Sequence, residues 1–157
     1  GELAQSDDSD MVSEEHVRGA QDELEKNQLY EGMQELTTQG HAVLCALAYD
    51  QALHDEPVRS RDLYDRYMKI CNQLDADSVS ERRVRDHLSD MNMLGLISVY
   101  EQNEGLSAGR YHEYELDLPL KPVLEVLVST NRFEEIAKTI QTIANDKNRL
   151  QSGISEY

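Results

Sequence analysis

The 157-residue sequence lacks the features of a secreted or membrane-bound protein. It contains no Trp, three Pro and two Cys, Cys45 and Cys71. Two cysteines cannot form the disulfide framework of a small secreted domain, and both fall on apolar helical faces, so we expect reduced, buried thiols of a cytosolic protein. No run of about 18 apolar residues occurs, and residues 1–10 are acidic, not basic and then apolar. We therefore expect no membrane span, no membrane partner and no secretion signal.

Basic residues are also scarce: 15 Lys and Arg stand against 31 Asp and Glu, a formal net charge of -16. Ten of the 15 are Arg and five are Lys. Such a charge opposes non-specific attraction to DNA or anionic lipid over the whole surface. An acid-rich, lysine-poor surface stays hydrated in concentrated salt and predicts a halophile; the alternative is an acidic mesophilic domain that binds a basic partner. We favour the halophile because the acids are spread along the whole chain.

Apolar residues make up 39% of the chain and recur at helical spacing. Residues 13–29 predict one helix and residues 30–36 a short second one. Thr37 or Thr38 can cap a third helix that runs to about residue 53, in which residues 42–48 are apolar on every side. A helix of that kind is normally the centre of a small core.

The next region has the element order of a winged helix-turn-helix. Ser60 can cap a helix over 60–74, and Ser80 can cap another that ends at Gly95, where a left-handed terminus belongs. Alternation predicts strands over 97–100 and 111–116. The expected fold is therefore mainly α with a small β-hairpin: a winged helix-turn-helix with extra N- and C-terminal helices.

Two further helices are expected at the C-terminal end. Residues 121–129 predict a short helix, and Asn131 with Glu134 resembles the capping box of a last helix. Its apolar stripe must pack on the domain or on another chain, and residues 151–157 are expected to fray. We divide the chain into an N-terminal linker segment (1–29), a winged-helix domain (30–118) and a C-terminal helical extension (119–157).

The basic residues gather on the predicted helix-turn-helix. Residues 59–85 hold seven basic and five acidic side chains, a net charge of +2, so the rest of the chain carries -18. Arg82 lies opposite the buried face centred on Val84, in the first turn of the helix that normally enters the major groove. Arginines there could simply pair with nearby acids. We favour DNA contact because the helix dipole disfavours cations at that end.

The predicted wing carries a further basic residue, Arg110, which follows Gly109 in an acidic neighbourhood. A lone arginine on a loop is often only solvated. Beside a helix-turn-helix, and next to Tyr111, it is better explained as a minor-groove or phosphate contact. The candidate DNA-binding residues are Arg59, Arg61, Ser80, Arg82, Arg83, Arg85, Gly109, Arg110 and Tyr111.

No residue pattern supports catalysis. His41 and Cys45 are four apart on one helix, but no second pair accompanies them, so a core role is favoured over a metal site. His112 and Glu113 lack the second histidine of a zinc protease. Neither a Walker-type phosphate loop nor a nucleophile elbow is present. We expect a non-enzymatic fragment with no cofactor.

Three stretches resemble a known family. SRDLYDRYMKICNQL (60–74), SERRVRDHLSDMNMLGLI (80–97) and GRYHEYEL (109–116) are similar to the C-terminal winged helix of archaeal origin-recognition (Orc/Cdc-type) replication initiators. GELA (1–4) and SEEHVRGAQ (13–21) resemble the end of the helical lid of that family's AAA+ ATPase module. The resemblance covers roughly residues 1–128.

The resemblance implies a module that binds double-stranded origin DNA, with the recognition helix in the major groove and the wing in the minor groove. ATP and Mg²⁺ would be needed only by the AAA+ module. Further partners would be a replicative helicase or another initiator copy, and the location would be the cytoplasmic nucleoid. The alternatives are a winged helix that mainly binds protein and a transcription regulator.

Overall fold

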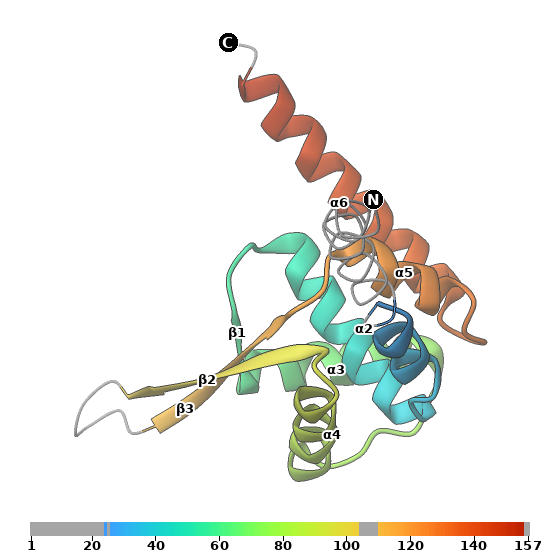
Figure 1. The fold of residues 1–157 in the computed structure, drawn as a ribbon, viewed down its shortest axis with the longest axis vertical. Helices are drawn as coiled ribbons and strands as arrows, with labels where there is room; N and C mark the ends of the chain where they lie inside the picture. Colours follow the sequence, from blue (N-terminus) through green and yellow to red (C-terminus); the bar gives the residue numbers. More distant parts are fainter. Residues whose placement is uncertain (1–23, 25, 104–109, 156–157) are drawn as a thin grey trace, which may run out of the picture.

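A central helix organises the fold. The computed structural model describes residues 24, 26–103 and 110–155, and α2 (Thr38–Leu53) lies in the middle of them (Figure 1). Thr37 caps α2 through its side chain, which accepts a hydrogen bond from the Gly40 N–H at 3.2 Å. Nearly all of its residues from Gly40 to Ala48 are fully buried. The expected all-round apolar core helix is confirmed.

The segment before α2 is a single helix within the described residues. Residues 26–34 are continuously helical, so the predicted break near residue 30 is wrong; the remainder of the predicted 13–29 helix lies outside the described residues. Met33, on this helix, is buried in the same core as α2. Its carbonyl accepts a hydrogen bond from His41 Nε2 at 2.8 Å, and burial lowers the pKa of His41. His41 is therefore the core residue that the sequence predicted.

The helix-turn-helix consists of α3 (Ser60–Leu74) and α4 (Glu81–Met93). Ser80 caps α4 as predicted, because its Oγ accepts a hydrogen bond from the Arg83 N–H at 3.3 Å. Ser60 does not cap α3. It is the first helical residue, and Arg59 holds the cap position without a side-chain bond. The reason is that Arg59 is fixed in extended conformation by pairing with a strand.

That strand belongs to a three-stranded antiparallel sheet in the order β1-β3-β2. β1 (Val58–Arg59) was not predicted, since two residues are too few to show alternation. β2 (Ile97–Asn103) and β3 (Arg110–Leu116) form the expected hairpin, somewhat longer than predicted, which projects from the domain as the wing (Figure 1). Gly95, before β2, has φ +83°, which confirms the predicted left-handed helix terminus.

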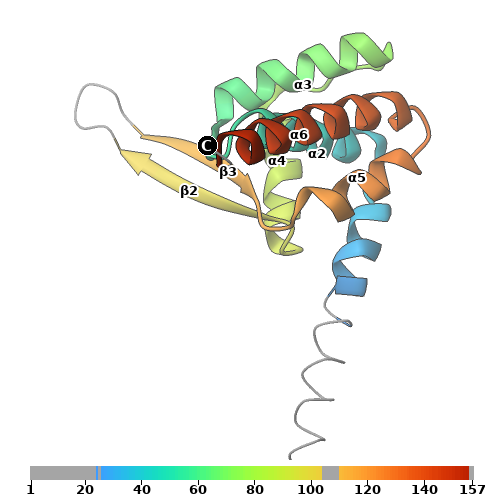
Figure 2. The same ribbon diagram turned by 90° about the horizontal axis from the view of Figure 1, so that it is seen from above.

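The C-terminal helices close the core on the side away from α4. α5 (Leu120–Val128) and α6 (Glu134–Ser155) both contact α2 (Figure 2). The apolar stripe of α6 packs on its own domain and contributes Ile136 and Ile140 to the core. The predicted capping box is wrong: Glu134 is the first helical residue, and the carbonyl of Phe133 accepts the Ala137 N–H at 2.9 Å.

Both cysteines are buried free thiols, as expected. Cys45 lies on α2 and Cys71 on α3, and burial raises the pKa of the Cys45 thiol to about 12. At neutral pH such a thiol stays protonated and unreactive. Within the described residues, no helix has the length and apolarity required to cross a membrane.

Candidate nucleic-acid interface

The N-terminal turn of α4 presents its arginines to solvent. Val84, Leu88 and Met91 are buried on one side of the helix, so the helical period directs Arg82 and Arg83 outward. Both are exposed, as is Arg85. Arg61, in the first turn of α3, is exposed as well.

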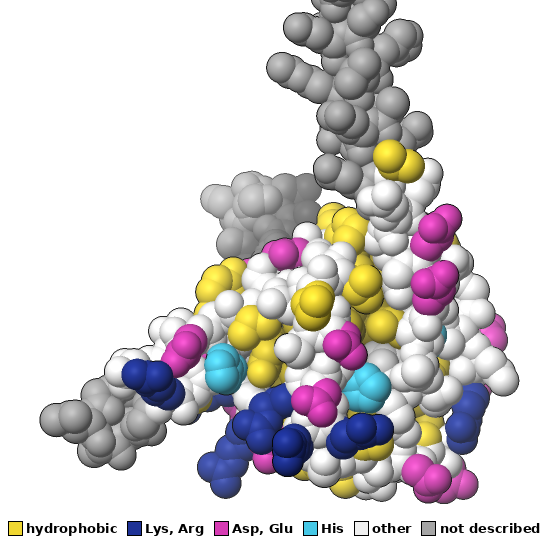
Figure 3. Space-filling model, turned by 60° about the horizontal axis from the view of Figure 1, so that its bottom comes forward, with side chains coloured by type: hydrophobic (Ala, Val, Ile, Leu, Met, Phe, Trp, Pro, Cys, Tyr) yellow, Lys and Arg dark blue, Asp and Glu magenta, His cyan; other side chains and the backbone are white. Residues whose placement is uncertain are grey.

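These arginines form no ion pairs with the acids that surround them in the sequence. None of the salt bridges among the described residues includes Arg61, Arg82, Arg83 or Arg85. The alternative explanation for them, internal pairing with Glu81, Asp86 or Asp90, is thus not realised. Figure 3 shows Lys and Arg side chains gathered on this face next to the wing, with only a few acids among them.

Two tyrosines of α3 fix the turn that leads into α4. The Tyr67 hydroxyl accepts the Val79 N–H at 2.9 Å and donates to Gln39 Oε1 at 2.5 Å. The Tyr64 hydroxyl donates to the Val79 carbonyl at 3.2 Å. Gln39, on α2, also donates to the Asp77 carbonyl. These bonds connect the core helix to the turn before Ser80 and set where α4 begins. They join residues far apart in the chain and were not predicted from the sequence.

The wing has two distinct faces, because successive residues of a strand point to opposite sides. Arg110 shares one face with His112, Tyr114 and Leu116, of which the last two are buried. Arg110 is 76% exposed and lies 3.5 Å from Glu101, which is 56% exposed. A pair this exposed contributes little to stability and is easily exchanged for another partner.

Tyr111 points to the other face of the wing, where it meets Arg59. The Arg59 guanidinium lies 4.0 Å from the centre of the Tyr111 ring. This contact links β1 to β3, whose residues Arg59 and Glu113 are paired across the sheet. The predicted site residues Arg110 and Tyr111 are therefore sequence neighbours with opposite orientations. Gly109 lies outside the described residues.

The base of the wing meets α3 at Tyr114, and Arg85 of α4 lies within electrostatic range of the Tyr114 hydroxyl. The Tyr114 side chain is 4% exposed and hydrogen-bonded to Ser60. Burial raises the pKa of Tyr114, while the Ser60 bond and the Arg85 charge partly oppose that shift. The face of the wing that carries Arg110 thus leads, at its base, toward Arg85 on α4.

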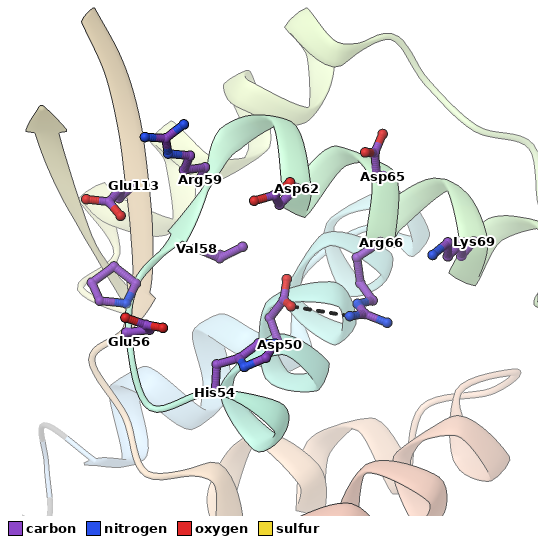
Figure 4. Close-up of a pocket in the computed structure, with 11 residues that line it drawn as sticks. Asp50, His54, Glu56, Val58, Arg59, Asp62, Asp65, Arg66, Lys69 and Glu113 are labelled. Carbon is purple, nitrogen blue, oxygen red and sulfur yellow. Dashed lines mark hydrogen bonds and ion pairs between the residues drawn. The ribbon is translucent and has the colours of Figure 1, made fainter. Parts of the chain in front are cut away.

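One basic residue of the helix-turn-helix is held away from this surface. Arg66 forms an ion pair with the buried Asp50 at 3.4 Å and lies 4.5 Å from the Tyr49 ring centre. The pair borders a cavity of about 520 Å³ between α2, α3 and the sheet (Figure 4). Burial raises the pKa of Asp50, and the charge of Arg66 partly opposes the shift. Arg66 is therefore a structural residue, although the charge count along the sequence included it.

A family model described as "CDC6, C terminal winged helix domain" matches residues 31–126. The chain belongs to this family. It is 37% identical over 144 residues to ORC1-type DNA replication protein 15 of Haloarcula marismortui and 37% identical over 147 residues to ORC1-type DNA replication protein 10 of Halobacterium salinarum. Each comparison covers 92% of this chain and 35% of the relative, so the chain spans about a third of their length.

A solved structure, that of the Aeropyrum pernix Orc1 protein in complex with DNA, is also similar to the chain. Its TM-score is 0.66 at 27% identity, over 76% of this chain and 30% of that one. The winged-helix fold and the resemblance to origin-recognition initiators are thereby confirmed. The domain is a Cdc6-type winged helix and not a catalytic module. The haloarchaeal origin of the two relatives supports the halophilic interpretation of the acidic surface.

Proposed function

We propose that this chain is the DNA-binding module of a replication initiator and recognises origin DNA through α4 and the wing. The observation that carries the proposal is the shared surface of the two elements. Exposed arginines at the start of α4 form no internal ion pairs among the described residues, and Arg110 shares its wing face with Tyr114, whose hydroxyl lies within range of the Arg85 charge on α4. The Orc1 protein in the similar structure is in complex with DNA, which supports the same assignment.

The two elements would make different kinds of contact. Arg82 and Arg83 lie at the exposed helix end that enters the major groove in helix-turn-helix proteins, where arginine recognises guanine edges. Arg110 projects from a thin hairpin that suits the narrower minor groove or its phosphates. Arg61 and Arg85 lie near the Arg82 and Arg83 positions and would contact phosphates, supported by the Ser80 cap. Arg59 would contact a phosphate from the other face of the wing, where it lies over the Tyr111 ring.

Roles of the whole protein beyond DNA binding are inferred from the family to which the chain belongs. Contacts with a replicative helicase or another initiator copy, and a place on the nucleoid, would follow from a role in initiation. ATP binding would belong to the part of the relatives that this chain does not cover. A winged helix that mainly docks a basic protein, or one that regulates transcription, is the competing function.

The test begins by selecting a duplex from a random-sequence library with the 157-residue chain, since the cognate site is unknown. Binding of the labelled selected duplex and of a scrambled duplex is then measured for the wild type, Arg82→Ala and Arg83→Ala. Each substitution should weaken cognate binding by about 1–3 kcal/mol if the side chain reaches a base edge. Equal losses on both duplexes would make these residues phosphate contacts.

The matched control is Lys138→Ala. Lys138 is exposed on α6, a helix on the opposite side of the fold from α4 (Figure 1), and pairs with Glu134 at 3.2 Å. This variant loses one positive charge without touching the proposed interface, so its binding should equal that of the wild type. If Lys138→Ala weakens binding as much as Arg82→Ala, the effect is one of overall charge and the α4 assignment fails. Absence of any selected duplex would favour the protein-binding function.

A further inference from the structure

We propose that His112 is an additional DNA-contacting residue, which supplies the interface with a positive charge that depends on pH. The inference rests on the proposed DNA-binding function. His112 lies on the same face of β3 as Tyr114 and Leu116. Nothing in the sequence showed which surface the exposed part of that face adjoins.

The position of His112 follows from the strand register. It lies between Arg110 and Tyr114 on the same face of β3, and its side chain is exposed. Its ring centre is 6.4 Å from that of Tyr114. Tyr114 in turn interacts with Ser60 at the start of α3, and its hydroxyl lies within range of the Arg85 charge on α4. His112 therefore lies along the surface that joins the wing arginine to the recognition helix, and Figure 3 shows histidine side chains among the basic ones there.

The surrounding charges show what a protonated His112 imidazole would do at this position. Glu101 is the cross-strand partner of His112 and forms the exposed ion pair with Arg110. When Arg110 turns to a DNA phosphate, Glu101 loses its partner and faces a polyanion. A protonated imidazole opposite Glu101 offsets that repulsion and attracts the phosphates. The charged and titratable groups around it are Arg110 and Tyr114 on β3, Glu101 on β2, and Arg85 and Glu81 on α4 near Tyr114.

This arrangement predicts that DNA binding takes up a proton. The negative potential of DNA favours the charged imidazole, so affinity should rise as pH falls from 8 toward 5.5. The arginines of the interface keep their charge throughout that range. A histidine is thus the group that can give the interface a pH dependence close to neutrality.

The experiment measures binding of the selected duplex by fluorescence anisotropy from pH 5.5 to 8 at constant KCl, with circular dichroism to confirm folding. Wild-type affinity should rise about two- to fivefold toward pH 5.5, the size expected of one exposed charge contact. His112→Gln should bind like the wild type at pH 8 and show no such rise. His112→Lys should bind at pH 8 as tightly as the wild type does at pH 5.5.

Two further histidines serve as controls. His54 is exposed beside the cavity, on the side of the sheet occupied by Glu113, and His54→Gln should keep the full pH dependence. His87 is half-buried on α4. If His112→Gln retains the wild-type slope, or if His87→Gln abolishes it, the assignment to His112 is overturned while the DNA-binding function stands. If the wild type binds no duplex at any pH, the proposed function itself fails.

Discussion

Tyr67 and Val79 are joined by a hydrogen bond that sets the geometry of the helix-turn-helix. The Tyr67 hydroxyl, on a fully buried side chain, accepts a hydrogen bond from the Val79 N–H at 2.9 Å and donates one to Gln39 Oε1 on α2. The bond ties the turn between α3 and α4 to the core helix. The direction in which the α4 arginines leave the domain therefore depends on a tyrosine that contacts no DNA.

Tyr67→Phe should destabilise the fold by about 1–2 kcal/mol, because it leaves the Val79 N–H and the Gln39 amide without this partner. Urea unfolding monitored by circular dichroism measures the loss. Tyr64→Phe is the matched control: Tyr64 is only partly buried, and its bond to the Val79 carbonyl is longer, at 3.2 Å, so its loss should be smaller. An unchanged midpoint for Tyr67→Phe would show that the turn is held by other contacts.

Arg110→Ala should weaken DNA binding while leaving thermal stability nearly unchanged, since its ion pair with Glu101 is exposed on both sides. Glu101→Gln should have the opposite effect on affinity, because it frees Arg110 and removes a carboxylate from the wing. Anisotropy titration and a thermal melt of each variant give the two quantities. A large drop in melting temperature with unchanged affinity would instead make the wing structural.

Arg66→Ala should cost about 2–4 kcal/mol of stability at pH 7, because it leaves the carboxylate of Asp50 buried without its partner. The folded-state pKa of Asp50 is already raised by burial, and loss of the Arg66 charge raises it further. The ionised carboxylate of Asp50 therefore destabilises the folded state. The deficit should be largest above the folded-state pKa and shrink as pH falls and Asp50 takes up a proton.

Urea unfolding between pH 4 and 7 measures that dependence. The double variant Asp50→Asn with Arg66→Ala is the control, since it has no carboxylate to leave unpaired, and its deficit relative to Asp50→Asn should be small and independent of pH. A deficit for Arg66→Ala that stays constant with pH would show that lost packing against Tyr49, and not charge, is responsible.

Local chemistry explains which elements the sequence could predict. The caps at Thr37 and Ser80 and the left-handed Gly95 depend on residues within one turn of each other, so they are visible in the sequence. β1 is different. Its two residues are extended because they pair with β3 more than 50 positions later, with Arg59 opposite Glu113. Because of that pairing, Arg59 and not Ser60 takes the cap position of α3.

The wrong prediction of where the last helix begins has a similar cause. The sequence placed the start of the last helix at Asn131, but Arg132 adopts φ +80° and its guanidinium donates to the Leu74 and Asp75 carbonyls at the end of α3. This distant contact delays α6 until Glu134. A local capping pattern cannot reveal it.

The sequence was enough to predict which residues make up the candidate site, but not how they are arranged in space. The surplus of arginine around α4 is a sequence property, and the helical period places Arg82 outward. Three other features follow from strand register and tertiary packing. Arg110 and Tyr111 point to opposite faces of the wing, Arg66 is held by Asp50, and the exposed face with His112 leads toward α4. These are the features that decide which residues can reach DNA together.

The salt dependence of DNA binding tests the central claim most directly. The chain brings a net charge of -16 to a polyanion, and that repulsion extends about 30 Å at 0.01 M salt but only about 3 Å at 1 M. Anisotropy titrations of the selected and scrambled duplexes from 0.1 to 3 M KCl, with circular dichroism at each point, measure affinity and folding together. We predict preferential binding of the selected duplex whose affinity is flat or rises over part of the molar range. A folded protein that shows no preference between the duplexes at any KCl concentration would contradict origin recognition, and a steep monotonic fall in affinity would contradict the salt-adapted interface.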